Sequence, residues 1–287
     1  MKIAERLTRV TLWLLCTSLL LCTQLRAQED EDNHIAHRPA VPEDLIDDPH
    51  VREELGVNEF TAPSIKRIFD DLDHLAPLPA DELKHEMPSR MPLDRADLAL
   101  EIGFLIADGF IAVQAGKMQR IEDLAKDLLR YSRALGVGDR VKRHTNSLLE
   151  NARDNNVEAL KKELRTTQRD VETDLIHLRD VDLAHLISLG GWIRALEVSS
   201  HAVKIKYTED RASRVFREDI CDYYEGSISA LDPRVSDRED MKEMREVIAG
   251  LRTVMTLDEG QKPTKEGVET IAEAARRLAT LALNRKR

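Results

Sequence analysis

Cysteine, glycine and aromatic residues are all scarce in this sequence of 287 residues, which has three cysteines, 12 glycines and 4% aromatics. Cys16 and Cys22 lie in an apolar N-terminal run, so Cys221 is alone in the rest of the chain. A single cysteine forms no internal disulfide, and stability must therefore come from a packed core. Few glycines argue against the elaborate loops that carry most active sites, and few aromatics give little surface for stacking sugars or bases.

Short motifs that mark common catalytic sites are missing as well. The sequence contains no serine flanked by glycines as a nucleophile elbow, no glycine-rich phosphate loop, no Cys-x-x-Cys and no His-Glu-x-x-His. Cys221 has no neighbouring signature of a catalytic thiol. These absences favour a protein that is not an enzyme and uses no cofactor.

The N-terminus has the order of parts of a signal peptide. Lys2, Arg6 and Arg9 precede an apolar run at residues 10–22, and the small residue Ala27 follows before an acidic stretch. The run is shorter than the roughly 20 residues that span a bilayer as a helix. We therefore expect a signal peptide at 1–27, cleavage after Ala27, no transmembrane anchor after cleavage, and a periplasmic or secreted bacterial protein.

The expected mature chain is strongly acidic. Residues 1–27 contain four basic residues and one acidic residue, so their removal changes the formal net charge from −10 to −13. Nucleic-acid binding needs clustered lysine and arginine on one face. The charge therefore argues against a nucleic-acid partner and favours a protein partner or a homo-oligomer.

Proline divides the chain sharply. Eight of the ten prolines fall between Pro39 and Pro92, and none occurs from Leu93 to Asp232. A long proline-free stretch rich in Leu, Ala, Arg and Glu is typical of extended helices. We expect a disordered acidic tail at 28–42, short helices punctuated by proline at 43–92, and a main helical domain at 93–287.

Apolar spacing predicts an all-α fold, either a multi-helix bundle or a short helical array without a sheet. The segment 94–115 carries apolar residues on two faces, which indicates a central helix. Further helices are expected at 118–135 and 182–206. The segment Val157–Leu178 has heptad-like apolar spacing, which predicts a hairpin or coiled-coil arm, either within the chain or as a dimer seam.

Two stripes of small residues indicate where helices touch. They repeat every four residues at Ala99, Gly103 and Ala107, and at Gly191, Ala195 and Ser199. Small side chains at this spacing let two helix backbones approach closely, so Gly103 and Gly191 are expected helix-packing residues. Trp192, beside Gly191, is interpreted as a core or interface anchor.

Six of the nine histidines have a carboxylate three positions earlier in the sequence. On a helix such pairs share a face, and they hold metal in some helical bundles. The candidates on long helices are Asp174, His177, Asp182 and His185. The same spacing is an ordinary surface ion pair worth about 0.2–0.5 kcal/mol, and this second interpretation is the one that we favour.

A stripe of three acids lies between the two apolar faces of the predicted central helix. Asp97, Glu101 and Asp108 share one side of the helical wheel. They are candidates for a buried cation-binding or general-base cluster. The alternative that we prefer is pairing with arginines or contact with water, because buried carboxylates are usually paired.

The sequence as a whole favours an exported, non-enzymatic helical protein that acts through protein–protein contacts in the bacterial envelope. Two alternatives stay open. One is a metal-binding helical protein that uses the acid-x-x-His pairs. The other is a carrier of an apolar ligand between its helices.

Overall fold

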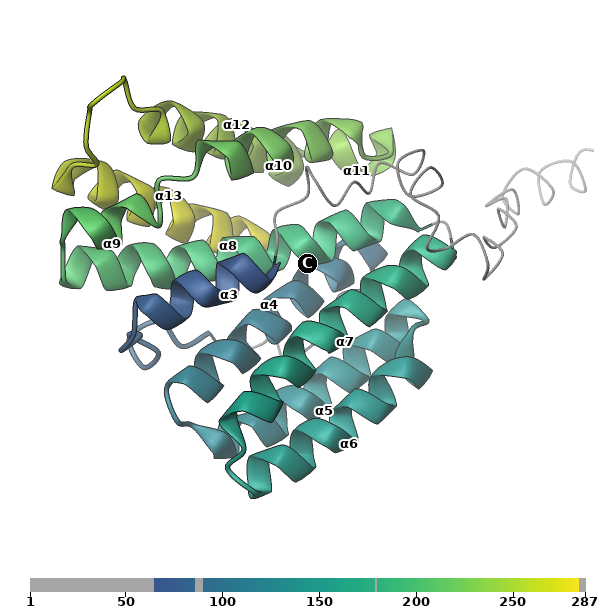
Figure 1. Ribbon diagram of the computed structural model, residues 1–287. Coiled ribbons are helices and arrows are strands. Elements are labelled where there is room, and N and C mark those ends of the chain that lie inside the picture. Colours follow the sequence, from purple (N-terminus) through teal and green to yellow (C-terminus); the bar gives the residue numbers. More distant parts are fainter. Residues whose placement is uncertain (1–64, 86–89, 179, 284–287) are drawn as a thin grey trace, which may run out of the picture. The chain divides into compact units, whose positions relative to one another are not determined.

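The computed structural model describes residues 65–85, 90–178 and 180–283, and these ranges contain helices and no β-strand (Figure 1). The all-α prediction is therefore confirmed. The expected signal peptide at 1–27 and the expected tail at 28–42 lie outside the described residues. In chain order, the helices are α3 (Ile65–His74), α4 (Arg95–Gln114), α5 (Met118–Leu135), α6 (Gly138–Arg153), α7 (Val157–His177), α8 (Val181–Ile205), α9 (Glu209–Ser213), α10 (Glu218–Ala230), α11 (Pro233–Ser236), α12 (Glu239–Met255) and α13 (Lys265–Leu283).

Two helices, α4 and α8, form the centre of this body. Every residue of α4 from Ala96 to Val113 is buried, as the apolar residues on two faces predicted. The partner with which α4 packs most extensively is α8. Figure 1 shows α5, α6 and α7 grouped beside α4, and α10, α12 and α13 grouped beside α8. The helix α3, from the proline-punctuated segment, packs against α8 and α4.

Local capping explains where the central helices begin and end. The side chain of Asp94 accepts hydrogen bonds from the backbone N–H groups of Ala96 and Asp97 and so starts α4. Gly136 ends α5 with a φ of 96°, a left-handed conformation that favours glycine. The observed bounds of α4, α5 and α8 lie within one residue of the expected ones.

The heptad-like segment is part of the body. Its helix α7 packs against α6, α4 and α8 of the same chain. The apolar side chains that set the spacing are buried there, namely Leu160, Leu164, Val171 and Leu175. The spacing therefore serves packing within the chain.

The two central helices approach each other at glycines. A Cβ atom built on Gly103 would lie 2.1 Å from the carbonyl oxygen of Ile187, and one on Gly190 would lie 2.2 Å from that of Leu100. A Cβ atom on Gly191 would lie 3.6 Å from the carbonyl oxygen of Gly103, which is ordinary van der Waals contact. The backbone of Gly191 also lies at this contact, since a Cβ atom on Gly103 would be 2.6 Å from the Gly191 nitrogen, but the Cβ position that faces α4 is that of Gly190.

This difference predicts opposite results for two adjacent substitutions. Gly190→Ala should destabilise the protein by about 1–3 kcal/mol, because the helices must separate to admit the methyl group. Gly191→Ala should leave stability unchanged or raise it, because alanine favours helix by up to about 1 kcal/mol over glycine. Thermal melting of both variants measures the difference. Equal melting temperatures would show that the backbones are not in close contact at Gly190.

Candidate functional site

A fully buried arginine links the two central helices. Arg194 of α8 has a relative exposure of 0%, yet its guanidinium donates to three separate acceptors. Its Nε donates to Asp108 Oδ1 at 2.8 Å, one Nη to Glu197 Oε2 at 2.6 Å, and the other Nη to the carbonyl oxygen of Leu83 at 2.6 Å. Burial of an unpaired cation is costly, so these acceptors are what makes Arg194 tolerable in the core.

The contacts around Arg194 extend to the loop between α3 and α4. His85 Nε2 lies 2.9 Å from Glu197 Oε2, and Arg120 of α5 lies 3.6 Å from Asp108 Oδ2. Burial alone would raise the pKa of Glu197, but the bonds from His85 and Arg194 outweigh it and lower that pKa below its usual value. The ionised network therefore pins the loop at Leu83–His85 against α8. We call six residues the Arg194 network: Leu83, His85, Asp108, Arg120, Arg194 and Glu197.

The three acids of the predicted stripe are all buried, and each meets a different partner. Asp97 accepts a 2.7 Å bond from Arg238, and Asp108 binds Arg194. Glu101 lies near the Tyr131 phenol, and burial together with this carboxylate raises the pKa of Tyr131 above its usual value. The acids are thus spread along α4 among separate contacts and form no common cluster.

Sequence reasoning did not identify Arg194 or Arg238 as the partners of these acids. A signal was present for Arg194, because it is the one charged residue from Leu186 to Leu196 in an otherwise apolar and small-residue run. A lone arginine in such a run has to find a buried carboxylate. Arg238 precedes a surface helix and carries no comparable signal.

In the described part of the chain, His74 and His85 meet partners other than the acids three positions before them. Asp71 pairs with Arg214, whereas the His74 ring contacts the carbonyl oxygen of Asp70. Glu82 and His85 have separate partners too, since Glu82 Oε2 lies 2.9 Å from His201 Nε2.

The candidates on the long helices do not assemble a metal site in the described part of the chain. Asp182 accepts from the backbone N–H of Asp232, and His185 Nδ1 lies 3.0 Å from the Tyr223 hydroxyl. The side chain of His177, three residues after Asp174, lies outside what the structure describes. Within the described ranges, no group of three or more His, Cys, Asp or Glu side chains is arranged to hold a metal ion.

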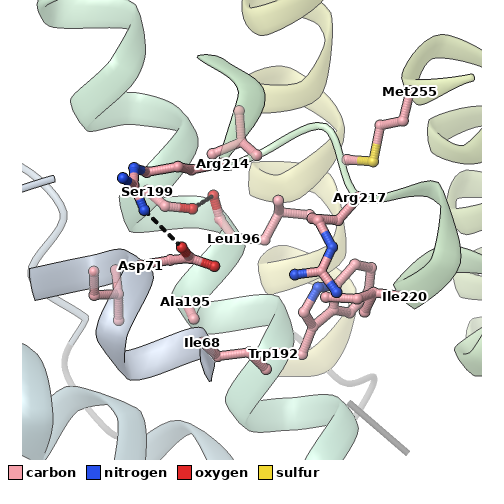
Figure 2. A pocket seen from close by; sticks show the side chains of 12 residues that line it. Ile68, Asp71, Trp192, Ala195, Leu196, Ser199, Arg214, Arg217, Ile220 and Met255 are labelled. Atoms are coloured by element: carbon pink, nitrogen blue, oxygen red, sulfur yellow. Dashed lines mark hydrogen bonds and ion pairs between the residues drawn. The ribbon is translucent and has the colours of Figure 1, made fainter. Parts of the chain in front are cut away.

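A small pocket opens beside α3, and Figure 2 shows the side chains that surround it. Its volume is about 40 Å³, which is room for roughly three water molecules. Trp192 of α8 contributes to the floor and stacks on Tyr224 with ring centroids 4.8 Å apart. Arg214 and Arg217, from the segment between α9 and α10, stand at the pocket with Asp71 of α3.

Cys221 lies close to this pocket but is itself buried. Its thiol is 3.6 Å from the sulfur atom of Met255, and burial raises the pKa of Cys221 to about 12. A thiol with so high a pKa is almost entirely protonated at neutral pH and is a poor nucleophile. Cys221 is therefore a packing residue in this fold.

Removal of Arg194 should be far more damaging than removal of an exposed arginine. Arg194→Leu leaves Asp108 and Glu197 buried without their main partner, and we expect it to cost about 3–5 kcal/mol in the free energy of unfolding. Arg234→Gln is the matched control, because Arg234 pairs with Asp232 on the surface. Urea denaturation compares the two variants. If the midpoint for Arg194→Leu equalled that of the control, the network would not stabilise the fold.

His185 should make stability sensitive to acid. Burial lowers the pKa of His185 below its usual value near 6.5, against a smaller opposing effect of Asp182. The fold therefore favours the neutral ring, and this stabilisation is present above about pH 6.5 and lost as the pH falls. Between about pH 7 and pH 5, His185→Gln should lose less melting temperature than the unsubstituted protein. The exposed His74→Gln serves as control, and parallel pH curves for all three proteins would refute the expectation.

Comparisons with protein-family models, curated proteins and solved structures find no match for this chain. Within the described ranges, no helix combines the length and apolar character needed to cross a membrane.

Proposed function

We propose that this chain is a non-enzymatic, exported helical protein of the bacterial envelope that acts by contacting another protein. The observation that carries the proposal is a pair of exposed leucines beside an ion pair at one end of the helical body. Leu93 has a relative exposure of 99% and Leu178 one of 45%. The export itself is inferred from the signal-peptide pattern at residues 1–27.

The two leucines come from distant parts of the sequence and are brought to the same end. Arg95, two residues after Leu93, binds Asp180, two residues after Leu178, with 2.8 Å between Nη2 and Oδ2. The same Arg95 nitrogen donates to the carbonyl oxygen of Leu135 at 3.2 Å. Figure 1 shows the end of α7 and the start of α8 at this end of the body. Apolar side chains with charged groups at their rim are the usual composition of a protein contact.

The free energy gained by burying the two leucines indicates the kind of contact that they can form. Complete burial of an exposed leucine side chain stabilises by about 1.5–3 kcal/mol. Because Leu178 is already more than half buried, the pair supplies about 2–4 kcal/mol. A micromolar complex requires about 8 kcal/mol after the costs of association. The leucines are therefore anchors of a contact that also needs the neighbouring charges and is reversible.

The charges inside the body support a structural role for the helices. The members of the Arg194 network bind one another, and these contacts hold the loop at Leu83–His85 against α8. The alternative of a metal-binding protein gains no support from Asp182 and His185, whose contacts lie elsewhere.

A cross-linked pull-down of the tagged chain from the envelope fraction of its source cell tests the proposal. We expect one or two envelope proteins to be enriched reproducibly. The double variant Leu93→Asp/Leu178→Asp should lower their recovery at least tenfold, since it places charge in the apolar contact.

Ile205→Asp is the matched control, because Ile205 is also exposed, at 58%, but ends α8 far along the chain from the leucine pair. The Ile205→Asp variant should recover the same amount of these envelope proteins as the unsubstituted chain. Equal recovery by the double variant, or enrichment of no protein while a known envelope pair is captured, would count against the proposal.

A further inference from the structure

We propose that an acidic segment of this chain, residues 43–48, docks on a basic surface at the turn between α5 and α6. The surface is formed by Arg133 of α5 and by Lys142 and Arg143 of α6, and we call it the α5–α6 surface. The segment itself lies outside the described residues. This inference is independent of the proposed protein contact, because it concerns other residues and a different kind of partner.

The cations of the α5–α6 surface are exposed and have no partner in the described part of the chain. The side chains of Arg133, Lys142 and Arg143 make no hydrogen bond or ion pair there. Residues 133–143 contain four basic residues and one acidic residue, Asp139, on a chain whose net charge is −10. Asp139 is exposed too and makes no ion pair within the same ranges. The surplus of positive charge is therefore not cancelled by contacts within the described helices.

The turn between the two helices holds these cations close together. A Cβ atom built on Gly138 would clash with Cγ of Arg133, so the Arg133 side chain passes directly over the first residue of α6. Lys142 is four residues after Gly138 and therefore lies on the same face of α6, one turn further along. Arg143 follows Lys142. A single extended segment is thus able to contact cations of both helices at once.

Residues 43–48 have the composition that complements this surface. Their sequence is Glu-Asp-Leu-Ile-Asp-Asp, with four acidic residues and no basic residue. Carboxylates bind guanidinium and ammonium groups through charge-assisted hydrogen bonds. One exposed ion pair contributes little by itself, but several that act together hold a segment more firmly. Because the segment belongs to the same chain, its local concentration at the surface is in the millimolar range, which favours docking over binding of a free peptide.

The tether between the segment and the body is long enough for this contact. Sixteen residues, 49–64, precede α3, and they span about 55 Å when fully extended. The pocket where α3 meets Trp192 of α8 lies about 16 Å along α8 from the start of that helix. The start of α8 adjoins the α5–α6 turn, because Arg95 binds both Asp180 and the carbonyl oxygen of Leu135.

Zero-length cross-linking of the full chain tests the proposal. A carbodiimide joins a lysine amine to a carboxylate only when the two groups are in contact, and mass spectrometry of the digested protein identifies the pair. We expect Lys142 to be joined to residues 43–48, with a yield at least about fivefold above that of Lys265, an exposed lysine at the start of α13. The surface pair Lys262 and Glu209, 2.7 Å apart, is the positive control for the reaction.

Two double variants test the role of the neighbouring arginines. Arg133→Gln/Arg143→Gln retains Lys142 and every acidic residue of the segment, so the reacting groups are unchanged while two attracting charges are removed. It should lower the yield at Lys142 at least about threefold. Arg153→Gln/Arg276→Gln is the matched control, because it makes the same change of charge at two exposed arginines elsewhere, and it should leave the yield unchanged. Melting curves confirm that each variant is folded.

Three outcomes overturn the proposal. A yield at Lys142 no higher than at Lys265, while the product of Lys262 and Glu209 is recovered, shows that the segment does not dock on this surface. Equal losses in the two double variants show that the net charge of the chain, and not the α5–α6 surface, directs the reaction. In a mixture of isotope-labelled and unlabelled chains, products that join the two kinds of chain show that the occupant belongs to a second copy.

Discussion

The close approach of α4 and α8 is the constraint on which the other features of this body depend. Two helices that are 66 residues apart in sequence lie backbone against backbone at Gly103 and Gly190. Leu100 meets Gly190 and Asp108 meets Arg194, so the two helices run in the same direction along their contact. Parallel neighbours cannot be joined by a short turn. The intervening α5, α6 and α7 supply the return path and at the same time cover α4.

The Arg194 network follows from this geometry. Because the helix axes are close, a side chain on α8 reaches a carboxylate on α4 without crossing water. Buried ion pairs add little net stability compared with apolar packing, but removal of one member leaves an uncompensated charge. A buried ion pair therefore acts mainly to select one arrangement of the helices over others. Here it selects the register of α4 against α8 and the position of the loop at Leu83–His85.

The same central helix borders two surfaces of the body. The start of α8 lies beside the leucine pair, whereas Trp192, Leu196 and their neighbours further along it line the pocket beside α3. A rigid helix held on all sides keeps both surfaces in fixed positions. A protein contact at the start of α8 is what we propose for one of these surfaces.

The sequence by itself determined the helices. Proline placement and apolar spacing act within a few residues, and so they predicted the bounds of α4 and α5 and the burial of α4 on two faces. The cap at Asp94 and the left-handed Gly136 agree with those bounds. The tertiary structure alone decided which helix positions and side chains contact one another. A step of one residue turns a helix by about 100°, so only packing decided that the Cβ position of Gly190, and not that of Gly191, faces α4. Likewise, His85 binds Glu197, 112 positions away, and not its local acid, because the fold brings α8 within reach. Local spacing places a charge on a face of a helix, but which charge lies opposite depends on how distant segments come together.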